Sequence, residues 1–189
     1  MKRTPGPASP VPALDLAVRD GGLVRLRRSL PGADRLEGFV VGTGPVWTLL
    51  ANCTDHRLDG WTAVRTADLR KVRRIGDEDG LTVRALRRRG DWPVRPPAGD
   101  LPLDDLPGLA EAASRAYGLI ALHTEESAPD VCWVGAVTGV RPKSLRLHRV
   151  DTEARWYDEP VKFRLDRITR IDLGTHYTAV LREFAGERP

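Results

Sequence analysis

The sequence contains little cysteine and little lysine. Among its 189 residues only Cys53 and Cys132 are cysteines, and they lie 79 positions apart. A secreted domain stabilised by disulfides would carry more, so the sequence excludes a disulfide framework and favours a reducing, cytoplasmic location. Only four of the 30 basic residues are lysines, an arginine preference that indicates a GC-rich bacterial genome.

Long apolar runs are also missing. No segment approaches the roughly 18 apolar residues that a membrane-spanning helix requires, so we expect no membrane association. The N-terminus, MKRTPGPASPVPALDL, has two basic residues but no apolar signal-peptide core, and we interpret residues 1–18 as a tail. Apolar residues make up 41% and charged residues 30% of the chain, which is typical of a folded globular protein.

Charge is divided unevenly along the chain. Residues 1–95 contain 18 Lys/Arg and 11 Asp/Glu, whereas residues 96–189 contain 12 and 15. The first part is therefore basic and the second part is slightly acidic. Such asymmetry bears on binding partners, and on how the two parts face each other, rather than on the fold.

The sequence repeats itself about half a chain apart. ADLRKVRRI at residues 67–75 corresponds to FRLDRITRI at residues 163–171, at an offset of 96 positions. The same offset, or one position more, relates three further pairs of segments. These pairs are Gly22–Leu26 with Gly118–Leu122, Gly38–Pro45 with Gly135–Pro142, and Gly90 with Gly186. Two copies of one domain explain these matches.

Each copy reads as five short strands. Apolar and polar residues alternate in GLVRL, and the G-x-V-x-G segments predict a strand that bends sharply or approaches its neighbour closely. Further strands are expected at residues 47–53, 61–65, 144–150 and 161–164. The corresponding segments at residues 67–75 and 163–171 each predict a short 3₁₀ turn before a last strand. Strong bending favours closure, so we predict a mainly β protein with two tandem five-stranded small barrels.

Helices and a linker complete the expected organisation. We place the first barrel at residues 19–90, a Pro-rich linker at 91–104, and a helix followed by the second barrel at 105–189. That helix should span residues 106–117, with Asp104 or Asp105 as its N-cap. Residues 81–90 and 177–186 also have helical spacing. Because a barrel of about 70 residues is marginal alone, the barrels should pack on each other or on a second chain.

Several motifs resemble a known family. They are LEGFVVG, LDGW and DLRKVRRI in the first half, and DVCWVG, RW and RLDRITRID in the second. Together they resemble the Sm-like and SH3-like small barrels and, more closely, a family of uncharacterised bacterial proteins that carry this barrel in tandem. The resemblance covers residues 20–186 and implies a fold but no activity. Asp55 and Asp59-Gly60 match the RNA-binding loops of Sm-like proteins only loosely.

Catalytic patterns are absent from the sequence. The four histidines are dispersed without partners at ligand spacing, which predicts no metal site. Cys53 and Cys132 lie in or near strands, where a small apolar role is favoured over a nucleophile. Gly42-Thr-Gly44-Pro45 lacks the lysine and the following helix of a phosphate loop and predicts a hairpin turn. We therefore expect no enzyme activity and no cofactor.

Basic clusters are the strongest functional signal. They mark the end of the first copy and the helix after it, and we interpret them as a nucleic-acid-binding surface. The residues are Arg65, Arg70, Lys71, Arg73, Arg74, Arg84, Arg87 and Arg88. The alternative is that these arginines pair with acids of the second copy, such as Asp104, Asp105, Glu125, Glu126, Asp158 and Glu159.

Aromatic side chains beside the polar loops offer possible stacking platforms for bases. Trp61 and Trp156 occupy such places, although packing in a core or at a barrel rim is the alternative. Two functions follow from the sequence. One is a non-enzymatic interaction protein that binds another protein or a second copy of itself, and the other is an RNA- or DNA-binding protein that uses the basic first barrel.

Overall fold

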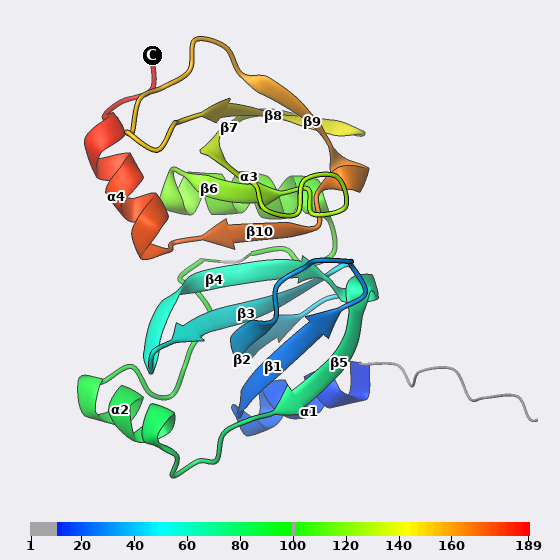
Figure 1. Cartoon of the computed structure of the whole chain (residues 1–189), viewed down its shortest axis with the longest axis vertical. Helices are drawn as coiled ribbons and strands as arrows, with labels where there is room; N and C mark the ends of the chain where they lie inside the picture. The colour runs from blue at the N-terminus through cyan, green and yellow to red at the C-terminus, as the bar shows by residue number, and fades with distance from the viewer. Residues whose placement is uncertain (1–10, 100) are drawn as a thin grey trace, which may run out of the picture.

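A single antiparallel sheet of ten strands dominates the computed structural model, which describes residues 11–99 and 101–189 (Figure 1). The strands are β1 (Leu23–Arg28), β2 (Leu36–Thr43), β3 (Trp47–Thr54), β4 (Arg57–Arg65), β5 (Leu69–Arg74), β6 (Ile120–His123), β7 (Cys132–Arg141), β8 (Ser144–Arg149), β9 (Val161–Arg164) and β10 (Arg170–Leu173). The helices are α1 (Val11–Asp20), α2 (Leu81–Arg89), α3 (Leu106–Tyr117) and α4 (His176–Ala185), with 3₁₀ turns η1 (Thr66–Asp68) and η2 (Leu165–Arg167).

The strand order confirms that the two halves share one topology. It runs β5-β1-β2-β3-β4 through the first half and β10-β6-β7-β8-β9 through the second, so each half places its last strand beside its first. Each half also has a helix before its first strand and another after its last strand. We call residues 11–90 the first half and residues 106–189 the second half.

A shared irregularity strengthens this equivalence. The pairing of β2 with β3 shifts by one residue between Val40 and Gly42, and the pairing of β7 with β8 shifts between Val137 and Gly139. A β-bulge of this kind bends the strand and increases its twist. The expected close approach is also confirmed, because a Cβ at Gly38 would collide with a neighbouring carbonyl oxygen.

The predicted alignment of residues 67–75 with residues 163–171 was wrong by three positions. Val72 on β5 pairs with Leu26 on β1, and Ile171 on β10 pairs with Leu122 on β6. Val72 and Ile171 are therefore equivalent, which sets the offset in this segment at 99 positions instead of 96. Both phrases repeat an apolar residue at every third position, so a slip of three leaves the apolar pattern unchanged.

The predicted closure into two barrels is not confirmed. Trp61–Val64 of β4 pairs with Arg170–Leu173 of β10, which joins the two halves into one open sheet. Figure 1 shows β4 and β10 side by side in the middle of the molecule, with one half above the other. Because β10 takes the free edge of β4, the first half does not close on its own β5. We call the β4–β10 pairing the seam.

The two largest hydrophobic clusters of the described residues lie in the first half and across the seam. In the first half, Leu14 and Ala17 of α1 pack on Leu26 and Leu50. In the second half, α3 packs on β6, β8 and β10, and this core also takes in Trp47, Leu49 and Ala63 from the first half. The expectation that the two halves pack on each other is thus met, through strand edges and a shared core.

Segments expected to be tail and linker are partly ordered. Residues 11–18 belong to α1, while residues 1–10 lie outside the described part. In the linker, Trp92 packs edge-on against Phe39 at 5.8 Å, and the Leu103 carbonyl accepts a 2.9 Å hydrogen bond from Trp47. The sequence signals missed this because apolar residues inside a Pro-rich stretch find partners only in the tertiary fold.

The three predicted helices are confirmed. At the start of α3, Asp105 Oδ1 accepts a 2.6 Å hydrogen bond from the Gly108 amide, and Gly118 ends the helix. The other two are α2 and α4, which follow the last strand of each half. No helix in the described ranges is long and apolar enough to cross a membrane.

Candidate nucleic-acid interface

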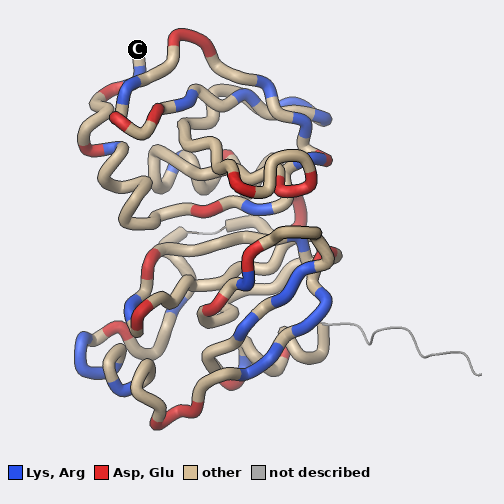
Figure 2. Tube along the Cα trace, in the orientation of Figure 1, with Lys and Arg blue, Asp and Glu red and all other residues tan. Residues whose placement is uncertain are grey.

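Five basic side chains of the first half surround one hollow. Arg25 and Arg27 come from β1, Arg35 from the loop that follows, and Lys71 and Arg73 from β5; together they line a cavity of about 120 Å³. Figure 2 shows Lys and Arg following β1 and β5 side by side. We call these five residues the strand patch.

The register of the two strands places like charges directly opposite each other. Arg25 pairs with Arg73, and Arg27 pairs with Lys71. Side chains alternate along a strand, so the buried Val24 and Leu26 direct both arginines of β1 to the other, solvent-facing side. Like charges directly opposite each other on two strands destabilise a sheet. Repulsion within the strand patch therefore lowers the free energy of unfolding.

Little neutralises this charge. Arg25 Nε lies 2.6 Å from Glu37 Oε1 in a half-exposed ion pair. Within residues 11–99 and 101–189, the other four side chains of the strand patch make no hydrogen bond or ion pair. Their positive charge is available to a ligand.

Part of this site was predicted from the sequence. Lys71 and Arg73 line the hollow, whereas Arg70 and Arg74 belong to β5 but do not line it. Arg74 pairs with the buried Val24, so its side chain lies on the other face of the sheet, beside α1. Arg74 is near Asp20 at 3.9 Å, and Arg70 donates to the Ala67 carbonyl at 3.3 Å.

Three members of the strand patch were missed, namely Arg25, Arg27 and Arg35. Alternation in GLVRLRR already places two of them on the polar side of β1. Their pairing with β5 depends on contacts between strands that are distant in sequence, and a single sequence does not display those contacts.

Arg65 belongs to a different environment. It lies at the end of β4, where it approaches Glu126 at 3.4 Å and donates to the Asp166 carbonyl at 2.5 Å. Both partners are in the second half. For Arg65, pairing across the two halves is the better interpretation.

Basic residues of α2 form a second, separate cluster, comprising Arg84, Arg87 and Arg88. Figure 2 shows α2 apart from the β1 and β5 stripes, so the predicted continuous basic surface is divided. Arg87 approaches Asp79 at 3.5 Å and lies 5.7 Å from the centre of the Trp92 ring. Arg87 and Arg88 also lie in the last turn of α2, where cations interact favourably with the helix dipole. We call these three residues the helix patch; Arg87 is thus partly engaged by neighbouring side chains.

The two predicted stacking residues are engaged in packing. Trp61 packs against Tyr117 with ring centres 5.8 Å apart and borders the shared core. Trp156 donates from its indole nitrogen to the Ala185 carbonyl at 3.0 Å, and its ring lies 5.1 Å from that of His148. Neither ring faces the strand patch, so the packing alternative is the better one for both.

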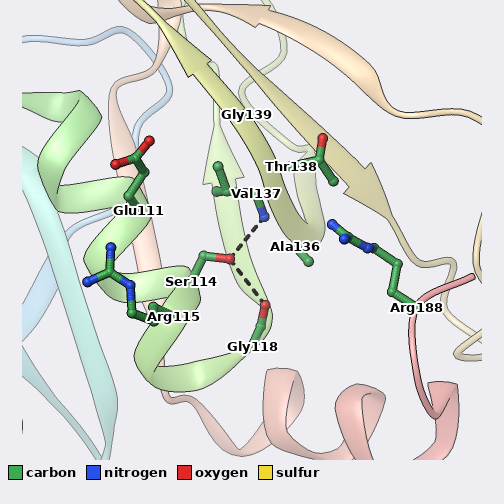
Figure 3. Close-up of a pocket in the computed structure, with 9 residues that line it drawn as sticks. All are labelled: Glu111, Ser114, Arg115, Gly118, Ala136, Val137, Thr138, Gly139 and Arg188. Atoms are coloured by element: carbon green, nitrogen blue, oxygen red, sulfur yellow. Dashed lines mark hydrogen bonds between the residues drawn. The ribbon is translucent and has the colours of Figure 1, made fainter.

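A larger groove lies between α3 and β7, with a volume of about 530 Å³ (Figure 3). Ser114 bridges its walls, because its hydroxyl accepts from the Val137 amide at 2.9 Å and donates to the Gly118 carbonyl at 3.3 Å. Glu111, Arg115 and Arg188 also border the groove. The Ser114 hydroxyl is thus engaged by backbone groups on both sides, and charges of both signs border the groove.

A buried ion pair joins the halves near one end of the seam. The Arg28 guanidinium donates two hydrogen bonds to the Glu125 carboxylate, one of 2.6 Å, and these side chains are 0% and 2% exposed. Thr169 adds a 2.7 Å hydrogen bond to Glu125. Burial tends to raise the pKa of Glu125, but the hydrogen bonds and charge of Arg28 outweigh it, so the pKa lies below its ordinary value.

A second polar cluster surrounds Asp172 on β10. Its carboxylate accepts from Thr62 at 2.5 Å and from Arg170 at 2.7 Å, and His123 Nε2 lies 2.8 Å away. Burial favours a higher pKa, but the His123 hydrogen bond and the Arg170 charge outweigh it and hold the pKa of Asp172 at about 2. Thr62 and Asp172 belong to different halves, so this cluster also supports the seam.

The two thiols are poorly suited to nucleophilic chemistry. Burial raises the pKa of Cys53 and of Cys132, and the negative charges of Glu37 and Asp172, respectively, raise them further. Both cysteines therefore remain thiols at neutral pH, and the thiolate is the reactive form.

Known proteins offer no further guide to this site. Comparison of the chain with protein-family models, with curated proteins and with solved structures finds no match in any of the three.

Proposed function

We propose that this protein is a non-enzymatic binding protein that holds RNA or DNA through the strand patch, on a scaffold made from two copies of one five-stranded unit. The common strand order and the common bulge support the duplication. The strand patch carries the nucleic-acid proposal, because contacts from lysine and arginine to phosphates supply most of the affinity of such proteins.

The charge on β1 has no other evident explanation. Basic residues on an edge strand protect it against pairing with other chains, which is sufficient for β5 at the end of the sheet. β1, however, pairs with β5 on one side and β2 on the other, so it has no free edge. Arg25 and Arg27 therefore support a ligand-binding role more strongly than the basic residues of β5 do.

The acidic residues of the second half do not neutralise the strand patch. Glu125 is bound to Arg28, and Glu126 approaches Arg65 at 3.4 Å and Arg167 at 3.7 Å. These contacts place the two acids at the seam. The alternative of pairing between the halves thus accounts for Arg65 and Arg28, but among the described residues it gives the strand patch no ion pair with the second half.

A salt titration tests the proposal. Binding of labelled single-stranded RNA and DNA should weaken steeply with salt, and the variant Arg27→Gln/Lys71→Gln should reduce the slope of log affinity against log salt by about 1 to 2. Arg84→Gln/Arg88→Gln, on the helix patch, removes the same charge and is the matched control. Absence of binding at low salt, or equal losses in the two variants, would contradict the proposal.

Association with a second copy is a further proposal for the same protein. It is favoured by α4, where Tyr177, Val180 and Phe184 are 47%, 37% and 74% exposed. Sedimentation of the intact chain over a range of concentrations tests it. A dimer that Phe184→Ser converts to monomer supports self-association, and a monomer at every concentration refutes it.

A further inference from the structure

We propose that the hollow of the strand patch binds the terminal phosphate of a nucleic-acid strand in preference to the phosphodiesters within it. This inference rests on the proposed function and specifies its ligand. The two kinds of phosphate differ in how much charge they carry on one group. A terminal phosphate monoester carries about two negative charges, and an internal diester carries one.

The charge density of the hollow fits such a group. Residues two apart on a strand are separated by about 6.6 Å, and directly paired residues by about 5 Å. Arg25, Arg27, Lys71 and Arg73 therefore originate from the corners of a small rectangle, and Arg35 adds a fifth cation from the neighbouring loop. After pairing of Arg25 with Glu37, four of these charges have no counter-charge among the described residues. A monoester would bring about two negative charges to this rectangle on one group, whereas each diester brings one.

The size of the hollow also fits an end group. Its volume of about 120 Å³ is well below the roughly 300 to 1,000 Å³ of ordinary ligand pockets. No aromatic or apolar side chain lines it, so a base would find no stacking partner there. A phosphate group can enter while the sugar and base remain outside, which is the arrangement that the end of a strand allows.

Other basic positions lack this concentration of charge. The groove between α3 and β7 includes Glu111 beside Arg115 and Arg188. In the helix patch, Arg87 is shared between Asp79 and Trp92. The strand patch is thus better suited than either to a group with more than one negative charge.

The test compares oligonucleotides of one sequence that differ only at their ends. Internally labelled strands with two hydroxyl ends, with a 5′ phosphate or with a 3′ phosphate are titrated with the full chain at low salt. A hydroxyl-ended strand two nucleotides longer matches the total charge of the phosphorylated strands. We expect a phosphate at the preferred end to strengthen binding about tenfold, the size of one charge-assisted hydrogen bond, and the longer strand to gain much less.

Variants then locate the effect. Arg27→Gln/Lys71→Gln should abolish the gain from the terminal phosphate, while Arg84→Gln/Arg88→Gln should retain it. Inorganic pyrophosphate, a compact phosphate anion without a base, should displace the phosphorylated strand from the unchanged chain at lower concentration than sulfate does. This competition needs no variant and is therefore independent of any effect of substitution on folding.

The two proposals fail in different ways. If all strands bind with equal affinity, or if the longer strand gains as much as the phosphorylated ones, the preference for an end is refuted while nucleic-acid binding stands. If no strand binds at low salt, both proposals are refuted.

Discussion

Four equivalent positions on the first and last strands of each half show how differently the two copies are used. In the first half they hold Arg25, Arg27, Lys71 and Arg73, and in the second half they hold Ala121, His123, Arg170 and Asp172. The first set is entirely basic and largely exposed, whereas the second set is mixed in charge and largely buried.

The difference follows from where each last strand lies. β10 is inside the sheet, between β4 and β6. Charged side chains there are buried, so they must be paired or replaced by uncharged residues. Asp172 and Arg170 satisfy each other at 2.7 Å. β5 is at the end of the sheet, where water solvates its charges. The repeated unit thus does not require cations at all four of these positions.

Removing Arg28 should have the largest effect, because it breaks the buried contact between the two halves. Arg28→Met leaves the Glu125 carboxylate buried without its main partner, and we expect a loss of about 3 to 5 kcal/mol in the free energy of unfolding. Chemical denaturation measures it. The double variant Arg28→Met/Glu125→Met should be distinctly more stable than the single one, and equal losses would show that the charge of Glu125 is not the cause.

Asp172 should make the free energy of unfolding depend on pH in the acidic range. Its pKa falls from the ordinary 3.8 to about 2 on folding, so its ionised form stabilises the fold above pH 3.8. Protonation removes that contribution, of about 2 kcal/mol, as the pH falls from 3.8 towards 2. In unfolding experiments at pH 6 and at pH 2.5, Asp172→Asn should therefore lose less stability between the two values than the unchanged chain. A parallel loss would exclude this role.

Copying a second-half residue into the first half tests the comparison directly. Arg73→Asp places there the residue that its equivalent position holds, and it should pair with Arg25 instead of repelling it. We expect the free energy of unfolding to rise by about 0.2 to 1 kcal/mol, while the salt slope of nucleic-acid binding falls by about 2. Thermal unfolding and a salt titration measure the two effects. A stabilised variant with unchanged binding would separate the strand patch from function.

Glu37→Gln should have the smallest effect. It removes the partner of Arg25 at a half-exposed ion pair, so the free energy of unfolding should change by less than about 1 kcal/mol. Binding should strengthen slightly because Arg25 becomes available to phosphate. The same titration at low salt measures this gain, and weaker binding would indicate that Glu37 instead orders Arg25 for its ligand.

Local patterns predicted the parts of the fold that depend on neighbouring residues. The alternation in GLVRL, the glycines of the second strand and the Asp105 cap each reflect contacts within a few residues or with the adjacent strand. The slip of three between the two copies arose because Val72 and Ile75 are equally apolar. Only pairing with β1 shows which of them matches Ile171.

Neither the seam nor the full strand patch could be predicted from a single sequence, and the physical reason is the same for both. Whether β4 pairs with β5 or with β10 depends on which arrangement buries Ala63 and Ile171 together in the shared core, a competition between distant segments. The hollow likewise depends on Arg27 meeting Lys71 across two strands. Composition indicated a basic first half, but the pairing of β1 with β5 determines which basic residues lie next to one another.

The seam also limits how the two copies can change over evolutionary time. Each of its four residue pairs joins a residue of one copy to a residue of the other, and the buried faces on both sides belong to one core. A larger side chain at Ala63 would have to be accommodated by Ile171. A mutation in one half therefore favours a compensating mutation in the other half. The two halves are therefore constrained together along the seam, whereas positions such as the outer face of β1 lie outside this constraint.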